Sequence, residues 1–217
     1  LLLKDERIDI NQGLNSGQTP FYIACYKGHI EIVRILLDNE KIDINKPKSD
    51  GRTPLYIACQ SGHIEIVKLL LNDSRIDISK ATNNITTPFY VACYRGHIEI
   101  VKLLLNDSRV DVIQVNDGRT PLYVACEHGY IEIVKLLLND DRADINKAKK
   151  DKTPFYVACQ YGQTEIVKLL LNDERVDVNK EHNKYGSTPF SAACCLGQAE
   201  VVKLLLNDER IDANKPN

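Results

Sequence analysis

Hydrophobic and polar positions in residues 29–45 follow a pattern that indicates a helix and then an extended segment. Glu31, Arg34 and Asp38 lie three and four residues apart, so they share one narrow polar stripe of a helix that begins near His29. Every other position from 30 to 37 is apolar. Because so much of this helix is apolar, we expect neighbouring elements to sandwich it.

A shorter helix is predicted just before it, from about Pro20 to Gly28. Thr19 can cap its first turn through the side-chain hydroxyl, and Pro20 suits the first helical position, where no amide donor is needed. Gly28 can end the helix in the left-handed conformation. After the second helix, the apolar–polar alternation of residues 42–45 suits an extended segment. A glycine two residues before the threonine then suits a turn with positive φ, at Gly17, Gly51, Gly118 and Gly186. Each unit is therefore predicted to be helix, turn, helix and hairpin-like loop.

This unit recurs in phase along the chain. The dipeptide Thr-Pro opens it six times at spacings of 33 to 35 residues, at Thr19, Thr53, Thr87, Thr120, Thr153 and Thr188. A period of this length indicates stacked repeats, in which each copy buries its apolar faces against its neighbours. We predict a single array over residues 1–217, with the tail of a truncated repeat at 1–11 and repeats at approximately 12–45, 46–79, 80–112, 113–145, 146–179 and 180–217.

The best-formed copies carry a recognisable set of motifs. They are Thr-Pro-Leu-Tyr-Ile-Ala at 53–58, Gly-His-Ile-Glu-Ile-Val-Lys-Leu-Leu-Leu at 62–71 and Ile-Asp-Ile at 76–78. With these motifs in phase over nearly its whole length, the chain resembles the ankyrin-repeat family, whose period is about 33 residues and whose signature is Thr-Pro-Leu-His-x-Ala. The resemblance implies an all-α repeat fold, an ankyrin solenoid of helix-turn-helix units with hairpin-like loops.

Three features depart from the family pattern. The signature histidine is replaced by tyrosine in five repeats and by Ser191 in the sixth, which leaves open whether the family's side-chain hydrogen bonds at that turn form here. The loop after the second helix lacks the family's glycine, so Asn72 or Asp73 is expected to take the left-handed cap instead. Ile85 and Asp151 stand where other hairpins have glycine, and we expect distortion of those two tips.

Composition adds few constraints. The 217 residues are 43% hydrophobic and 27% charged, with a formal net charge of −2, so the global charge gives no reason to expect nucleic acid or an anionic membrane as partner. No apolar run approaches the ~20 residues that span a bilayer. We therefore expect no nucleic-acid binding and no direct membrane insertion.

The cysteines invite a metal or disulfide interpretation, which the repeat phase argues against. Equivalent positions of packed helices lie about 10 Å apart, beyond the ~7 Å Cα limit for a disulfide. We expect small buried thiols and a reducing intracellular compartment, with only the out-of-phase Cys195 open to solvent. Six of the seven cysteines share one phase, just after alanine, at Cys25, Cys59, Cys93, Cys126, Cys159 and Cys194.

Sequence signatures of enzymes are weak or absent. Cys-x3-His recurs three times, but later repeats replace the histidine by Tyr130, Gln163 and Gln198, so we expect these histidines at the turn between the helices and no bound metal. No phosphate-binding glycine loop or nucleophile elbow occurs. We expect no enzymatic activity, no catalytic residues and no cofactor.

Comparison of the six copies with one another shows where they differ. The second helix hardly changes, whereas variation concentrates at the end of the first helix and in the loop before Thr-Pro. In the ankyrin family these positions line the concave groove and the hairpin tips where partners dock. Tyrosine and arginine among them are typical of binding hot spots, although unselected surface positions can also drift. The resemblance implies a partner-binding surface formed by Tyr26, Lys27, Arg52, Gln60, Ser61, Thr86, Tyr94, Arg95, Arg119, Glu127, His128, Lys152, Gln160, Tyr161 and Tyr185.

Lysines also recur in the loops. A basic rim of this kind can steer an acidic partner, and it can equally be a solvated edge that resists aggregation. The lysines are Lys46, Lys48, Lys80, Lys147, Lys149, Lys150, Lys152, Lys180 and Lys184.

The leading hypothesis is a non-enzymatic, monomeric scaffold in the cytoplasm that binds a protein partner through the groove and loop tips. The alternative is a structural or regulatory ankyrin segment of a larger multidomain protein whose activity lies outside this fragment. Residues 1–9 are expected to be the tail of a second helix, and residues 199–206 are as apolar as an internal helix. We therefore expect the natural array to continue in both directions.

Overall fold

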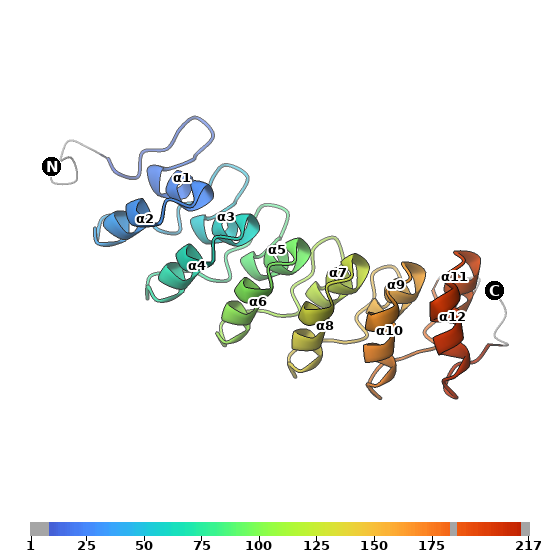
Figure 1. The fold of residues 1–217 in the computed structure, drawn as a ribbon. Helices are drawn as coiled ribbons and strands as arrows, with labels where there is room; N and C mark the ends of the chain where they lie inside the picture. Colours follow the sequence, from blue (N-terminus) through green and yellow to red (C-terminus); the bar gives the residue numbers. More distant parts are fainter. Residues whose placement is uncertain (1–8, 183–185, 214–217) are drawn as a thin grey trace. The chain divides into compact units, whose positions relative to one another are not determined.

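The computed structural model describes residues 9–182 and 186–213. Within these ranges the chain forms twelve helices, and its only β pairing consists of isolated bridges. The helices are short and come in pairs, one pair for each Thr-Pro unit (Figure 1). This confirms the predicted all-α repeat fold. The expected helical tail at residues 1–9 lies almost wholly outside the described residues.

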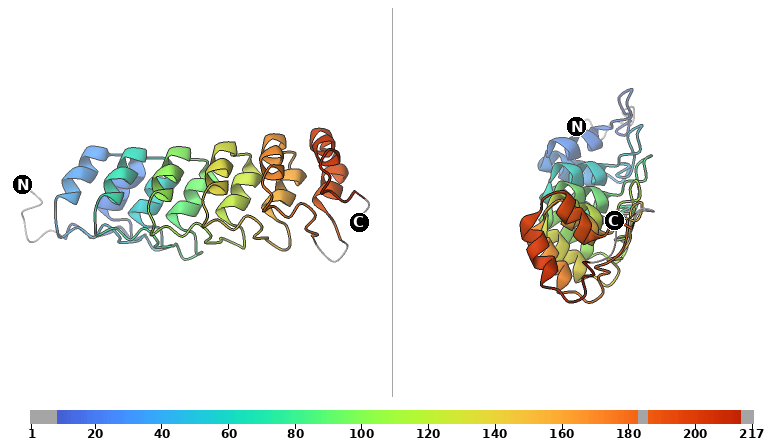
Figure 2. Two further views of the ribbon diagram at one scale, coloured as in Figure 1. Left: turned by 90° about the horizontal axis from the view of Figure 1, so that it is seen from below. Right: turned by 90° about the vertical axis from the view of Figure 1, so that its right-hand side faces the viewer.

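The chain divides into two compact units, Leu1–Asp111 and Val112–Asn217, and each is described by itself. Unit 1 contains α1 (Pro20–Lys27), α2 (Ile30–Leu37), α3 (Pro54–Ser61), α4 (Ile64–Leu71), α5 (Pro88–Arg95) and α6 (Ile98–Leu105). Unit 2 contains α7 (Pro121–His128), α8 (Ile131–Leu138), α9 (Pro154–Gln160), α10 (Thr164–Leu171), α11 (Pro189–Cys195) and α12 (Ala199–Leu206). Within each unit the first helices of the pairs pack in series, the second helices do the same, and the loops run along one side (Figure 2).

Each first helix begins and ends as the sequence predicts. Thr19 has an extended backbone, and its hydroxyl accepts the amide hydrogen of Tyr22 at 3.0 Å. The equivalent bond occurs in all six repeats, and such a cap stabilises a helix by about 1 kcal/mol. Gly28 has φ 77°, and the amide of His29 closes the end by donating to Ala24 at 3.0 Å.

Burial follows from stacking rather than from any single pair. Leu55, Ala58 and Cys59 of α3 are fully buried, because α1 and α5 pack against α3 from its two sides. Second helices bury one face and expose the polar stripe. In α2, which no described helix pair precedes, Ile32 and Ile35 are exposed, so the expected sandwich is found for the equivalent face of α4 and not for α2.

The tyrosines that replace the family's histidine are buried and serve as core. In the sixth repeat the smaller Ser191 restores a side-chain bond at the turn: Thr188 donates its amide hydrogen to the Ser191 hydroxyl at 2.9 Å, and the Thr188 hydroxyl accepts from the Ser191 amide. This reciprocal capping box is specific to the sixth repeat among the six first helices described.

The second helix ends differently from the expectation. Neither Asn72 nor Asp73 is left-handed; Asn72 has φ −78°. The Asp73 carboxylate instead accepts from the amide and the guanidinium of Arg75, the closest contact being 2.6 Å. This side-chain turn replaces the missing glycine, so the prediction of a left-handed cap was wrong.

The same arginine joins consecutive repeats. Arg75 Nη2 donates to the carbonyl oxygen of Leu37, at the C-terminal end of the preceding second helix, at 3.0 Å. Carbonyl groups at a helix end lack partners within the helix, and a cation is favourable there. Arg175 and Arg210 make the equivalent bonds to Leu138 and Leu171.

Asparagine side chains form a second connection between repeats, which we call the asparagine ladder. The Asn45 amide donates to the carbonyl oxygen of Arg75 at 2.7 Å and accepts from the amide of Asp77 at 2.9 Å. Asn11, Asn146 and Asn179 make the same pair of bonds. At the two intervening positions the chain has Ser79, whose hydroxyl bonds to Asp77 in its own loop, and Ile113, which has no side-chain donor or acceptor.

Hairpin length accounts for the uneven repeat spacing. The closing backbone bond joins residues four apart at Lys48 and Arg52, three apart at Asn116 and Arg119, and five apart at His182 and Ser187. The longer or shorter spacing to the next Thr-Pro follows this difference. The helix pairs are therefore constant, and insertions enter only at the tips.

The hairpin tips without glycine keep the conformation that glycine has elsewhere. Ile85 has φ 63° and Asp151 has φ 66°, compared with 84° at Gly51. The expected distortion is not found; the tip conformation is retained with a side chain that disfavours it. A β-branched residue with positive φ is strained, by about 1–3 kcal/mol.

Ile113→Asn should raise the free energy of unfolding by about 1 kcal/mol, because it supplies one of the two pairs of bonds that the asparagine ladder lacks. Ile113 is 49% exposed, so the loss of its side chain costs little burial. Urea denaturation measures the change. Asn146→Ser is the matched control and should lower the free energy of unfolding by a similar amount. An unchanged free energy of unfolding in Asn146→Ser would show that the ladder contributes nothing to stability.

Ile85→Gly should stabilise the protein by about 1 kcal/mol, because it removes the strained backbone at an exposed tip. Asp151→Gly should give a smaller gain, because aspartate tolerates the left-handed region better than isoleucine. Thermal denaturation of the two variants measures this order. A lower melting temperature for Ile85→Gly would mean that its side chain contributes more than the strain costs.

Candidate functional site

The variable positions of the first helix and of the hairpin lie next to each other. In two repeats the residue just before the threonine contacts a residue eight positions later, near the end of the first helix. Arg119 Nη1 lies 3.2 Å from Glu127 Oε2, and Lys152 Nζ lies 2.8 Å from Gln160 Oε1. The capped turn at Thr-Pro places these two side chains on the same side of the repeat.

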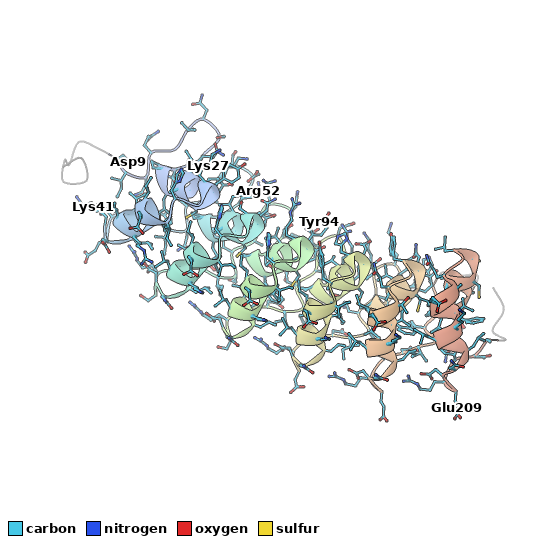
Figure 3. The ribbon with its side chains drawn as sticks, in the orientation of Figure 1. Asp9, Lys27, Lys41, Arg52, Tyr94 and Glu209 are labelled. Atoms are coloured by element: carbon cyan, nitrogen blue, oxygen red, sulfur yellow. The ribbon has the colours of Figure 1, made fainter. Side chains whose placement is uncertain are left out.

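In unit 1 these positions surround one hollow of about 390 Å³. Five of the predicted binding residues meet there: Tyr26 from α1, Arg52 from the hairpin before α3, Gln60 and Ser61 from α3, and Arg95 from α5. Lys27, Arg52 and Tyr94 follow one another along the first helices (Figure 3). We call this the unit 1 hollow, and its lining residues are Gln18, Tyr22, Tyr26, Lys48, Arg52, Ile57, Gln60, Ser61 and Arg95.

Sequence comparison missed part of this lining. Gln18 precedes Thr19 as Arg52 precedes Thr53, so the repeat phase alone was enough to include it. Tyr22 and Ile57 belong to the core pattern of the first helix, and their edges reach the hollow only because the repeats are stacked.

Tyrosine rings and cations contact one another around the hollow. Lys27 Nζ lies 5.1 Å from the Tyr26 ring centroid, and Tyr26 is 44% exposed. Arg95 lies 5.7 Å from the ring of Tyr94. Tyr94 itself stacks on Tyr90 with centroids 6.4 Å apart and is half-buried.

The other predicted residues lie outside the hollow. Thr86 closes its own hairpin: its carbonyl oxygen accepts from the amide of Thr82 at 3.0 Å, and its amide donates to the Thr82 hydroxyl at 3.1 Å. In unit 2, Tyr161 is 51% exposed, and His128 contacts the ring of Tyr130. Tyr185 lies outside the described residues.

Charge in the unit 1 hollow is positive. Lys48, Arg52 and Arg95 line it, and no lining residue is acidic. Asp50 lies beside it and pairs with Lys48 Nζ at 3.0 Å and Arg52 Nε at 3.5 Å. Partial burial raises the pKa of Asp50, but the hydrogen bonds and charges of Lys48 and Arg52 together outweigh burial and hold it below its usual value.

Several loop lysines are used inside the fold. Lys46 and Lys80 donate to the carbonyl oxygens of Asn11 and Asn45 in the preceding repeats. Lys149 pairs with Asp117 of the neighbouring hairpin. These lysines therefore connect repeats as well as adding positive charge to the loops.

Comparison with known proteins agrees with this geometry. The family model for ankyrin repeats (3 copies) matches residues 1–82, 77–149 and 142–217. The chain belongs to the ankyrin-repeat family. The crystal structure of the human ASB11 ankyrin repeat domain is similar to it, with a TM-score of 0.79 and 26% identity over 92% of this chain and 87% of that chain. No curated protein matches the sequence.

Ankyrin repeats are generally protein–protein interaction modules, and their fold is typically non-catalytic. Among the residues described, no helix is both long and apolar enough to cross a membrane. The same part of the chain holds no cluster of three or more potential metal-ligating side chains.

His29, His63 and His97 lie at the turn between the two helices of their ankyrin repeats, as expected. His63 and His97 also connect neighbouring repeats. His63 Nε2 lies 2.9 Å from the carbonyl oxygen of Tyr26, at the end of the preceding first helix. Since a carbonyl oxygen only accepts, Nε2 carries the proton. Gln163 Nε2 donates in the same way to the backbone carbonyl oxygen of Glu127 at 3.3 Å. This explains why glutamine replaces histidine without changing the repeat.

Five of the six in-phase cysteines are buried as predicted. Burial strongly raises the pKa of the Cys59 thiol, so almost no reactive thiolate forms there. Cys194 is exposed together with Cys195, because no described helix packs on that side of α11. The prediction of a buried Cys194 was therefore wrong.

In the native protein, Cys194 and Cys195 should react with a thiol reagent while the other five cysteines stay protected. The buried thiols combine a raised pKa with exclusion of reagent, so they should react more than about tenfold more slowly. Titration in denaturant should then reach all seven. Fast labelling of Cys59 or Cys93 would contradict the burial described here.

Proposed function

We propose that this ankyrin-repeat chain binds a protein partner through the unit 1 hollow. The observation that supports this most directly is the meeting of Tyr26, Arg52, Gln60, Ser61 and Arg95 around one hollow. These are positions at which the six copies differ, whereas the helices that hold them are nearly constant.

The chemistry of the hollow suits recognition. Tyrosine and arginine dominate binding hot spots, and tyrosine presents a large area at low cost in conformational entropy. The second helices, in contrast, expose the same Glu–Lys pair in five of the six repeats, such as Glu65 and Lys68 at 2.7 Å, and the similar pair Glu31–Arg34 in the first. A repeated surface of that kind offers a partner little to distinguish one repeat from another.

The variable positions of unit 2 are proposed to contribute further contacts. Tyr161 offers an exposed ring, and the Arg119–Glu127 pair is partly shielded from solvent. The free thiols of Cys25, Cys59 and Cys93 support the proposal that the protein works in a reducing compartment.

Affinity capture from the cells that express the chain, followed by mass spectrometry, identifies the partner. Tyr26→Ala combined with Arg95→Ala should then raise the Kd at least about fivefold, the equivalent of ~1 kcal/mol. Both side chains are exposed, so the melting temperature should hardly change. Titration calorimetry measures the affinity.

The matched control is Glu99→Ala with Lys102→Ala, which removes an exposed ion pair of 2.7 Å on the second helix of the same repeat. It should leave the Kd unchanged, because exposed pairs contribute little. If the control abolishes binding and the first pair does not, the partner uses the second helices and the proposal fails.

A further inference from the structure

The positive charge of the unit 1 hollow is only partly neutralised from within the protein. Asp50 is the one carboxylate among the described residues that pairs with its lining, through Lys48 Nζ and Arg52 Nε. Within the same ranges no carboxylate lies at ion-pair distance from Arg95, which instead lies over the Tyr94 ring. Three cations thus line the hollow, and a single carboxylate pairs with two of them.

Arg52 and Arg95 line the hollow from consecutive repeats. The Arg52 guanidinium lies 6.0 Å from the Tyr56 ring centroid. Burial raises the pKa of Tyr56, while the positive charges of Arg52 and then Arg95 act in the opposite direction. Two guanidinium groups from consecutive repeats therefore border the same hollow, and that of Arg52 also lies near the Tyr56 ring.

The remaining walls are apolar or neutral. Ile57 and the rings of Tyr22 and Tyr26 line the hollow. Burial raises the pKa of Tyr22 to about 12, so its hydroxyl stays protonated at neutral pH and can donate a hydrogen bond. A group that fits these walls has a short apolar stem and an anionic end that accepts hydrogen bonds.

We infer that the unit 1 hollow binds the carboxylate of an aspartate or glutamate in an acidic segment of the partner, held between Arg52 and Arg95. This rests on the proposed function and adds the chemistry of the partner. A guanidinium favours a carboxylate because its planar N–H groups match the two oxygens. The apolar stem then lies against Ile57 and Tyr26.

A nucleic acid fits this surface less well than an acidic peptide. Phosphodiester chains need positive charge along an extended track, whereas the cations here are gathered at one hollow. The carboxylate Glu99 on the neighbouring second helix is already paired with Lys102, and the whole chain has a net charge of −2. The hollow therefore suits a single anionic side chain.

The probe is a phage-displayed library of random 12-residue peptides selected against the folded chain. Selected peptides should be enriched in aspartate and glutamate. In the tightest peptide, replacing the acidic residue by its amide should weaken binding more than about fivefold, measured by fluorescence anisotropy. Affinity should also fall as salt rises from 50 to 300 mM, because the attraction is partly exposed and screened.

Arg95→Gln tests the contact directly, because Arg95 is exposed and its loss leaves the fold intact. Arg95→Gln should weaken binding of the acidic peptide more than about fivefold and leave binding of the amide peptide unchanged. Lys102→Gln should change the binding of neither peptide. This non-additivity is the signature of a direct pair. Arg52→Gln should behave like Arg95→Gln, provided that its melting curve matches that of the original chain.

Other results would overturn the inference. Selected peptides whose binding depends on Tyr26 but which show no enrichment in acidic residues would support the proposed function and refute the inferred carboxylate contact. Binding only of a phosphoserine version of the peptide would assign the hollow to phosphorylated partners. Equally tight binding of a single-stranded oligonucleotide would make it a general polyanion site, and peptides indifferent to Arg95→Gln would place the acidic contact elsewhere.

Discussion

Burial of the second helix depends on a neighbouring repeat, and the rest of the structure follows from this constraint. In α4 the apolar residues Ile66, Val67 and Leu70 are buried, yet one helix pair offers only a single surface to cover them. Where no described pair precedes, as at α2, Ile32 and Ile35 remain exposed. The fold of each unit is therefore cooperative between repeats and not within one repeat.

Side chains at constant positions convert this apolar stacking into a fixed geometry. His63 bonds to the end of the preceding first helix, Arg75 to the end of the preceding second helix, and Asn45 to the backbone of the following loop. Each satisfies backbone groups that a short helix or an irregular loop leaves without partners. Because these residues fix the register between repeats, the remaining positions can vary without loss of the fold, and the candidate binding residues are found among them.

Local signals were enough to predict the helices, because their caps lie within a few residues in sequence. Thr53 and Gly62 define α3 in this way. The failures concern the end of the second helix and a position whose burial depends on neighbouring repeats. The end of the second helix was mispredicted because the Asp73–Arg75 turn, with its bond to Leu37, replaces a glycine cap. Cys194 was mispredicted because burial of that phase requires a neighbour on each side.

The candidate site was predictable in position but not in shape. Repeat comparison found Arg52 and Arg95, yet nothing in the sequence says that they line one hollow from consecutive repeats. The contrast with Arg75 is instructive. Arg75, Arg175 and Arg210 recur in phase, and each donates to a carbonyl oxygen at the end of a helix in the preceding repeat. Their hydrogen bonds thus stabilise the stacking of repeats. Arg95 stands at a position whose residue type changes from repeat to repeat, so this position is not one that bonds to the backbone of the neighbouring repeat throughout the array. Arg95 lines the hollow instead. The same residue type therefore joins repeats at one phase and lines the candidate site at another.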